Sequence, residues 1–324
     1  MRLGILNRKF FVVACIAGLS VAFVACKKDN RNDNDNGNDN GNNNNSNTWA
    51  QKANYPGAAV AEAMAVSING KIYVGMGCNK IGCKSDLWEY DPATNKWTEK
   101  SDFPWGQISG HIAHFVIGDK LYIVTASVWE YNATTNQWTQ KTDYPIESDG
   151  RYMPASFSYN NKGYLLLKDC GLEYNPATDT WLQFSTERTL YSYAATASSE
   201  QMVYTIEYKS YFWTYNLATN KWYQKPNFPI ENLSTATAVA FCKDGVFYAG
   251  LGCAGDGGYL VNKIYKYNNE DNSWNLATTV PDAIRRASGI AVMCNGKLYV
   301  GLGFSGGAGI AGSVYSVDFW EYTF

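Results

Sequence analysis

The amino-acid sequence predicts an all-β fold, namely a six-bladed β-propeller whose first strand closes its last blade. Three features lead to this prediction: an aromatic hairpin that returns along the chain, an apolar hairpin ahead of each copy, and a lone aromatic strand at the start that matches a gap at the end. The copies recur at roughly 41 to 52 residues, a period that is typical of propellers built from four-stranded sheets.

The first feature is a tyrosine followed seven residues later by a tryptophan. It stands out in residues 87–104, LWEYDPATNKWTEKSDFP. The pairs are Tyr90/Trp97, Tyr131/Trp138, Tyr174/Trp181, Tyr215/Trp222 and Tyr267/Trp274. The turn between the rings is rich in Asn, Asp, Pro and Thr, and Asn or Asp before the second strand tolerates a positive φ. Each copy is therefore expected to be a tight hairpin.

The second feature is an apolar hairpin ahead of each aromatic one. Its turns include Asn69-Gly70, Gly118-Asp119, Asp244-Gly245 and Asn295-Gly296, which are strong hairpin signals. Two hairpins give four strands per repeat. Over nearly all of residues 48–324 the pattern resembles kelch repeats: strand, glycine turn, YVGxG, loop and EYDPxTNxW. The double glycine of such repeats appears as GMG, GLG and GLG in three copies and is lost in the other three.

The third feature concerns the two ends of the domain. Tyr322 lies two residues from the C-terminus, so a following tryptophan strand is missing there. Residues 47–56, NTWAQKANYP, match the segment NKWTEKSDFP of the first repeat. The strand with Trp49 is therefore expected to complete the last blade, which leaves no open sheet edge between the ends.

The N-terminal residues predict export and lipidation. Residues 1–25 have a basic start and a short apolar stretch, as in a signal peptide. Val24-Ala25-Cys26 resembles a lipobox, in which Cys26 receives palmitate-type acyl chains; ordinary secretion with cleavage after Ala25 is the alternative. Residues 26–47 would then be the lipidated cysteine and a disordered Asn/Asp-rich tether. These features predict an outer-membrane lipoprotein that faces the periplasm or the cell surface.

Uneven loops predict which face of the propeller carries function. If strands are called a to d from the centre outward, the b–c and d–a loops share one face. The b–c loops of repeats one, five and six are long and span residues 77–86, 252–262 and 303–313. Because these repeats are neighbours in a ring of six, they should form a wall on half of that face. Loops on a rigid scaffold often carry function, although glycine-rich loops that merely drift are the alternative.

Strand a should line the central channel, and its first residues supply the candidate site. Equivalent positions, counted back from the strand-b tyrosine, include Glu62, His111, Arg151, Tyr193 and Arg286. Arginine forks suit a carboxylate, and a Glu–His neighbourhood suits acid–base chemistry. Glu62 and His111 are therefore catalytic candidates, and Arg151, Tyr193 and Arg286 are ligand-binding candidates. The alternative for the arginines is that they tie blades together.

Two aromatic residues outside the repeat template, Trp105 and Tyr259, are further ligand-binding candidates because exposed rings beside polar groups suit sugars. Packing beneath the loops is the alternative for both. His114 has the opposite strand parity to His111 and is expected to pack between blades.

Cysteines, charge and histidine content limit the remaining possibilities. Cys78 and Cys83 share the loop GCNKIGC and are a disulfide candidate in an exported protein, and Cys242 with Cys294 is a second possible pair. No CxxC pair exists and the chain has two histidines, so no metal site or other cofactor is expected. The net charge of −2 gives no electrostatic footprint for nucleic acid. We expect a monomer.

Within the resemblance to kelch propellers, known bacterial activities include binding, galactose-oxidase-like copper chemistry and sialic-acid mutarotation. The copper hypothesis fits poorly because His111 and His114 have opposing parity. The favoured hypothesis is a non-catalytic, membrane-tethered module that binds a carbohydrate or a protein partner. The alternative is a mutarotase- or epimerase-like enzyme, in which Glu62 and His111, or Glu207, would transfer protons.

Overall fold

The protein is described by a computed structural model over residues 48–107, 112–145, 154–190, 194–255, 259–305 and 314–324. The predicted residues Cys26, His111, Arg151 and Tyr193, together with the signal and tether segments, lie outside this part of the chain. The described residues contain no helix long and apolar enough to span a membrane.

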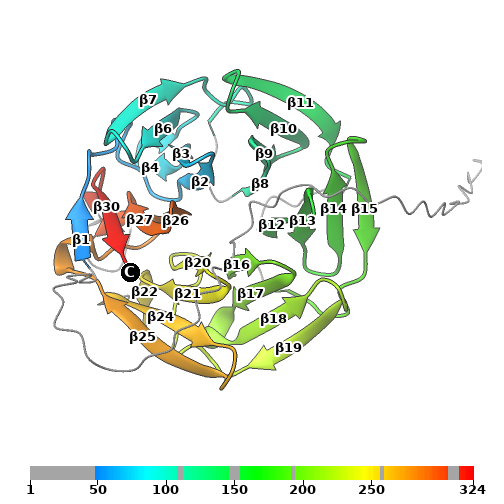
Figure 1. Cartoon of the computed structure of the whole chain (residues 1–324), viewed down its shortest axis with the longest axis vertical. Coiled ribbons are helices and arrows are strands. Elements are labelled where there is room, and N and C mark those ends of the chain that lie inside the picture. Colours follow the sequence, from blue (N-terminus) through cyan, green and yellow to red (C-terminus); the bar gives the residue numbers. More distant parts are fainter. Residues whose placement is uncertain (1–47, 108–111, 146–153, 191–193, 256–258, 306–313) are drawn as a thin grey trace, which may run out of the picture.

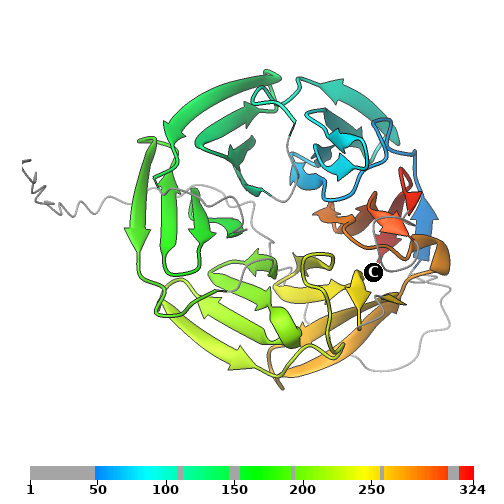
Figure 2. The same cartoon turned by 180° about the vertical axis from the view of Figure 1, so that it is seen from behind.

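Six four-stranded antiparallel sheets form a ring, which confirms the predicted six-bladed propeller (Figure 1). The reverse view shows the same six sheets around one centre (Figure 2). Blade 1 contains β2 (Met64–Ile68), β3 (Lys71–Gly75), β6 (Leu87–Asp91) and β7 (Lys96–Lys100). Blade 2 contains β8 (Ala113–Ile117), β9 (Lys120–Val124), β10 (Ser127–Asn132) and β11 (Gln137–Asp143). Blade 3 contains β12 (Ala155–Tyr159), β13 (Lys162–Leu166), β14 (Gly171–Asn175) and β15 (Thr180–Phe184).

The other three blades repeat this order from the centre outward. Blade 4 contains β16 (Ala195–Ser199), β17 (Met202–Ile206), β18 (Phe212–Asn216) and β19 (Lys221–Lys225). Blade 5 contains β20 (Val239–Lys243), β21 (Val246–Gly250), β24 (Lys263–Asn268) and β25 (Ser273–Thr279). Blade 6 contains β26 (Ile290–Cys294), β27 (Lys297–Gly301), β30 (Phe319–Thr323) and β1 (Thr48–Gln51). Two single 3₁₀ turns, η1 (Tyr208–Ser210) and η2 (Asp282–Ile284), lie in loops.

The N-terminal strand closes the ring, as the sequence predicts. β1 pairs antiparallel with β30, and Trp49 stands opposite Tyr322 with ring centroids 4.8 Å apart. Lys52 then forms an ion pair with Glu321 at 3.2 Å. Because the first and last strands share one sheet, the closure ties both ends of the domain into the same blade.

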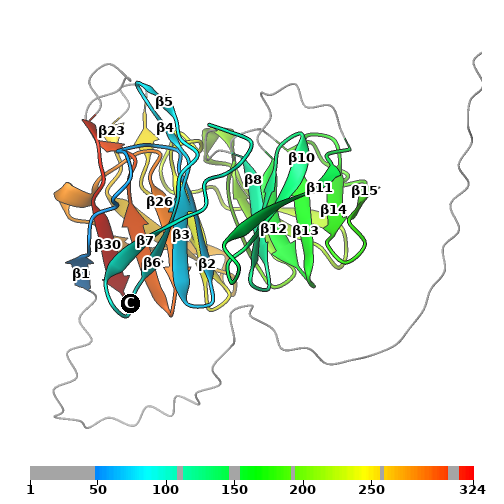
Figure 3. The ribbon, with the colours of Figure 1, turned by 90° about the horizontal axis from the view of Figure 1, so that it is seen from above.

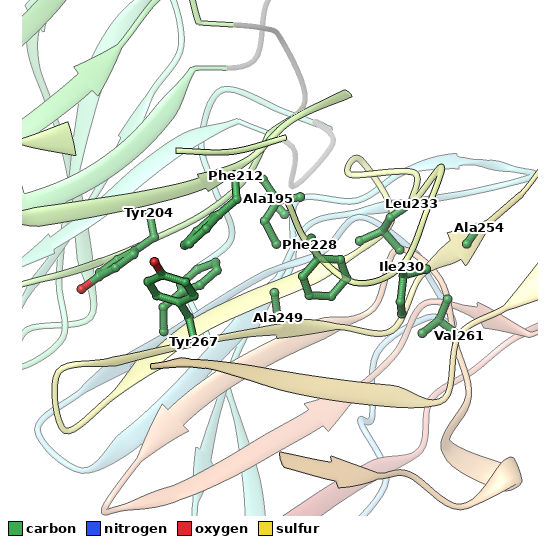
Figure 4. Packing of buried hydrophobic residues seen from close by; sticks show 12 residues of the cluster. Ala195, Tyr204, Phe212, Phe228, Ile230, Leu233, Ala249, Ala254, Val261 and Tyr267 are labelled. Carbon is green, nitrogen blue, oxygen red and sulfur yellow. The ribbon is translucent and has the colours of Figure 1, made fainter. Parts of the chain in front are cut away.

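The apolar core consists of clusters between neighbouring blades. The described buried residues form six such clusters, one at each interface around the ring. Figure 4 shows the cluster between blades 4 and 5, in which Phe212 and Tyr267 approach to 4.7 Å between ring centroids. The propeller therefore buries its aromatic strands face to face between sheets rather than in one central core.

The repeated Tyr–Trp hairpin carries a latch between blades. Asn95 adopts the predicted positive φ, 54°. Its Oδ1 accepts hydrogen bonds from the Tyr90 hydroxyl and from the backbone N–H of Ala53, both at 2.9 Å. The Trp97 indole N–H donates to the Ala53 carbonyl at 2.9 Å. Ala53 follows the outer strand of blade 6, so the turn residue joins two blades as well as shaping its own hairpin.

A buried glutamate in strand c provides a second recurring contact. The hydroxyl of Tyr299 in strand b donates to Glu321, which also accepts from Lys297 at 2.8 Å. Burial alone would raise the pKa of Glu321, but hydrogen bonds from Lys297, Tyr299 and Lys52 lower it below its ordinary value. The same tyrosine–glutamate bond recurs in three other blades, as Tyr73/Glu89, Tyr122/Glu130 and Tyr164/Glu173.

Candidate functional site at the channel mouth

Three long b–c loops form the wall that the sequence predicts. Each contains a small hairpin: β4 (Cys78–Asn79) with β5 (Gly82–Cys83), β22 (Cys253–Ala254) with β23 (Tyr259–Leu260), and β28 (Phe304–Ser305) with β29 (Val314–Tyr315). In Figure 3, β4, β5 and β23 rise above the level of the main sheets on one side of the ring. The wall therefore belongs to the contiguous blades 5, 6 and 1.

The hairpins are fastened to the preceding d–a segments in the same way in all three blades. Isolated bridges pair Ala61 with Cys78, Leu233 with Ala254 and Ala287 with Phe304. The first hairpin also contains a disulfide between Cys78 and Cys83, the pair that the sequence singled out. Cys242 and Cys294, the second possible pair, are not joined by a disulfide. Within the part of the chain that the structure describes, the base of each wall loop is thus paired backbone.

A cavity of about 270 Å³ lies at the channel mouth beside this wall. All six blades contribute to its lining, mainly through small side chains at the beginning of strand a. The polar members are Glu62, His114, Ser156, Thr196, Thr235 and Ser288. The volume is close to the lower end of the range for small-molecule sites. A carboxylate, an imidazole and several hydroxyls can here meet one small polar ligand.

Glu62 is placed in the cavity by an unusual backbone conformation. Its φ is 57°, in the left-handed region that few residues other than glycine adopt. Its N–H donates to the carbonyl of Ser288 at 2.9 Å, and the N–H of Ser288 donates to Thr237 at 2.9 Å. These bonds link blades 5, 6 and 1 at the channel mouth. The prediction that Glu62 lies at this mouth agrees with the structure.

His114 lines the cavity, a position that the sequence did not predict. Its ring Nδ1 lies 2.9 Å from the Ile112 carbonyl, and its backbone N–H donates to Ser156 Oγ at 3.1 Å. Alternate residues of a strand point to opposite faces. Ala113 and Phe115 pack in the cluster between blades 2 and 3, whereas Val116, on the same strand face as His114, packs against the cluster between blades 1 and 2.

Arg286 has the structural role that was the alternative for the arginines, although it fastens a loop rather than two blades. It is 2% exposed and forms two parallel hydrogen bonds with Asp318, at 2.8 and 2.9 Å. Its other bonds go to the carbonyls of Ile284 and Leu302, at 2.8 and 2.9 Å. The guanidinium thereby ties the base of the blade 6 loop to the d–a segment and faces protein groups. A direct role in ligand binding does not fit this geometry.

Glu207, the other proposed proton carrier, is also committed to an ion pair. Its side chain is 0% exposed and pairs with Arg188 through two hydrogen bonds of 2.8 Å. Arg188 in turn lies over the rings of Trp213 and Trp222, at 4.0 and 5.0 Å. Both carboxylate oxygens are engaged by Arg188, so Glu207 no longer supports an enzymatic role.

Trp105 and Tyr259 are exposed but stand outside the lining of the cavity. Trp105 is 50% exposed in the segment between blades 1 and 2, and Tyr259 is 60% exposed on β23 of the wall. Trp105 also contacts Trp129, with ring centroids 6.3 Å apart. Among the described residues there is no group of three or more His, Cys, Asp or Glu side chains that could hold a metal ion.

Fold and site together define a six-bladed β-propeller with a walled polar cavity at one end of its channel. Residues 62–104, which cover blade 1, match the family model described as Kelch motif, and this match confirms the resemblance drawn from the repeat pattern. A solved structure titled "Structure of YjhT" aligns with a TM-score of 0.66 and 14% sequence identity, covering 82% of this chain and 95% of that one. At this identity the alignment shows a shared fold. No curated protein matches the chain.

Proposed function

We propose that the protein is an exported, membrane-tethered binding propeller that takes a carbohydrate at its channel mouth. The observation that carries this proposal is the cavity of about 270 Å³, lined by Glu62, His114 and four hydroxyl side chains. Such a cavity suits a small ligand with many hydroxyl groups. A protein partner, the other ligand considered, would be expected to contact the exposed wall rather than enter this space.

The position of the N-terminal strand supports the tethered arrangement. Thr48 pairs with Thr323, at the end of β30 that is farthest from the wall loop of blade 6. In Figure 3, β1 lies toward the lower face of the ring, whereas β4, β5 and β23 project from the upper face. The Asn/Asp-rich tract of 19 residues, 29–47, would span about 25 Å as a flexible coil. A propeller anchored through Cys26 would therefore present its cavity away from the membrane.

Glycan-array binding by the purified full chain in detergent tests the ligand. The side-chain oxygens of Glu62 can accept hydrogen bonds from sugar hydroxyls, so Glu62→Gln should weaken binding about 10- to 100-fold. Glu99→Gln, on outer strand β7 of the same blade, is the matched control and should leave binding unchanged. Equal binding by wild type and Glu62→Gln would refute the proposed site, and absence of any glycan signal would refute carbohydrate binding.

The tether is tested separately. Cys26→Ser should move the protein from the membrane fraction to the soluble fraction and abolish incorporation of labelled palmitate. Membrane association that survives this change would show that the protein is not held by an acyl group on Cys26.

A mutarotase-like enzyme is the second candidate, because a carboxylate and an imidazole line one cavity. Opening a sugar ring at the anomeric carbon needs only proton transfer to and from oxygen. In this alternative Glu62 and His114 would share that transfer, with His114 in place of the originally proposed His111. Anomer exchange measured by NMR would show faster interconversion with the wild type than with His114→Asn. Equal rates with wild type, variant and buffer would eliminate the enzyme.

A further inference from the structure

The link between β17 and β18 of blade 4 displays two exposed tyrosines. Tyr208 is 68% exposed and Tyr211 is 39% exposed, whereas Tyr204 and Tyr215 in the flanking strands are 3% and 1% exposed. Large aromatic side chains are costly to leave in water when the fold does not require it. The exposure of this pair leaves both rings accessible to a ligand.

The backbone beneath these rings is strained and firmly held. Lys209 and Ser210 both have positive φ, 61° and 62°, although neither is glycine. Such conformations are unfavourable and persist only where surrounding contacts enforce them. Here the N–H of Glu207 donates to Tyr211 at 2.8 Å, the N–H of Phe228 donates to Ser210 at 2.9 Å, and the Ser210 hydroxyl donates to the Ile230 carbonyl. The turn is a fixed support for the two tyrosines.

Comparison with the other short b–c links shows that the aromatic pair is particular to blade 4. The equivalent links of blades 2 and 3 are closed by similar bonds, from Thr125 N–H to Ser127 and from Leu167 N–H to Cys170. Those links have the sequences TAS and LKDC, whereas blade 4 has EYKSY. The repeat architecture does not need aromatic residues at this place.

The tyrosine pair lies close to the cavity. Ala195, which lines the cavity, is the cross-strand partner of Ile206 at the end of β17. Tyr208 follows Ile206 by two residues. One cross-strand step and two steps along the chain place its Cα within about 13 Å of the Ala195 Cα. One short, extended ligand can reach both places.

We propose that Tyr208 and Tyr211 form a stacking platform for one unit of an oligosaccharide whose end occupies the channel-mouth cavity. The flat ring of tyrosine covers the apolar face of a sugar, and its hydroxyl offers a hydrogen bond at the ring edge. The Lys209 ammonium, 5.7 Å from the centre of the Tyr208 ring, adds a donor for sugar oxygens. This inference rests on the proposed carbohydrate function and extends it from a single sugar to a chain.

The test compares affinities for an array-selected oligosaccharide and for its terminal monosaccharide, measured by calorimetry with the full chain. Tyr208→Ala and Tyr211→Ala should each weaken oligosaccharide binding about three- to tenfold and leave monosaccharide binding unchanged. Tyr208→Phe should keep most of the affinity because it keeps the ring. Tyr223→Ala, which removes a tyrosine 46% exposed on outer strand β19 of the same blade, should change neither affinity.

Each remaining result points to a particular failure. Unchanged oligosaccharide binding in both alanine variants, or a Tyr208→Phe loss as large as that of Tyr208→Ala, overturns the platform while the cavity proposal stands. Loss in the alanine variants with an unaffected Glu62→Gln overturns the cavity and keeps a blade 4 sugar site. A wild-type protein that binds no saccharide overturns both.

Discussion

Removal of the Asp318 charge should be among the most damaging single changes in the propeller. The Arg286 side chain is 3% exposed and that of Asp318 is 19% exposed, and their two parallel hydrogen bonds hold the base of the blade 6 loop. Burial by itself would raise the pKa of Asp318, but the hydrogen bonds and charge of Arg286 lower it below its ordinary value. The carboxylate is therefore charged at neutral pH and balances the arginine.

The two partners should not be equally sensitive. Asp318→Asn leaves a nearly inaccessible guanidinium without its counter-charge, which typically costs about 3–5 kcal/mol of unfolding free energy. Arg286→Met leaves a more exposed carboxylate that still accepts hydrogen bonds from Ser316 and Trp320. That loss should be about 1–3 kcal/mol. The double variant Arg286→Met/Asp318→Asn should be more stable than Asp318→Asn alone, because it has no orphan charge.

Urea unfolding followed by tryptophan fluorescence measures all four proteins. From most to least stable, the predicted order is wild type, Arg286→Met, the double variant and Asp318→Asn. Equal stability of the double variant and Arg286→Met is also consistent with the argument. A loss below about 1 kcal/mol for Asp318→Asn, or a double variant weaker than both single ones, would refute the buried-pair argument.

Three further changes probe other parts of the fold. The pKa of Glu321 is lowered in the folded state, so its charge stabilises the fold above the ordinary pKa of 4.5, and this stabilisation is lost as the pH falls below that value. The wild type should therefore lose more unfolding free energy than Glu321→Gln between pH 6 and pH 3. Parallel curves of stability against pH would contradict this. Gly250→Ala would place a Cβ 2.0 Å from the Lys263 carbonyl oxygen. We therefore expect the free energy of unfolding to fall by about 1–3 kcal/mol, with a lower melting temperature. An unchanged melting temperature would show that strands b and c separate freely at this position. Cys83→Ser removes the disulfide of the blade 1 wall loop and should lower the free energy of unfolding by about 2 kcal/mol in a denaturant titration, because the unfolded chain gains loop entropy. A variant that titrates like the wild type, with and without reductant, would mean that the disulfide does not form.

The proposed site was only partly predictable, because strand position alone does not fix the partners of a side chain. Spacing correctly placed Glu62 at the channel mouth and the long loops in blades 5, 6 and 1. It could not foresee that Arg286 meets Asp318, 32 residues away, or that Glu207 meets Arg188. A sequence alone does not show whether an arginine or a glutamate faces solvent or an ion-pair partner.

The sequence by itself determined the number of blades, the order of strands and the closure by Trp49, because these follow from a local pattern repeated along the chain. Only the tertiary structure decided which residues face the channel. His114 lines the cavity together with Glu62, although strand parity had suggested a place between blades for it. Which side of a strand remains open depends on how adjacent sheets pack, and that information is spread over residues far apart in the chain.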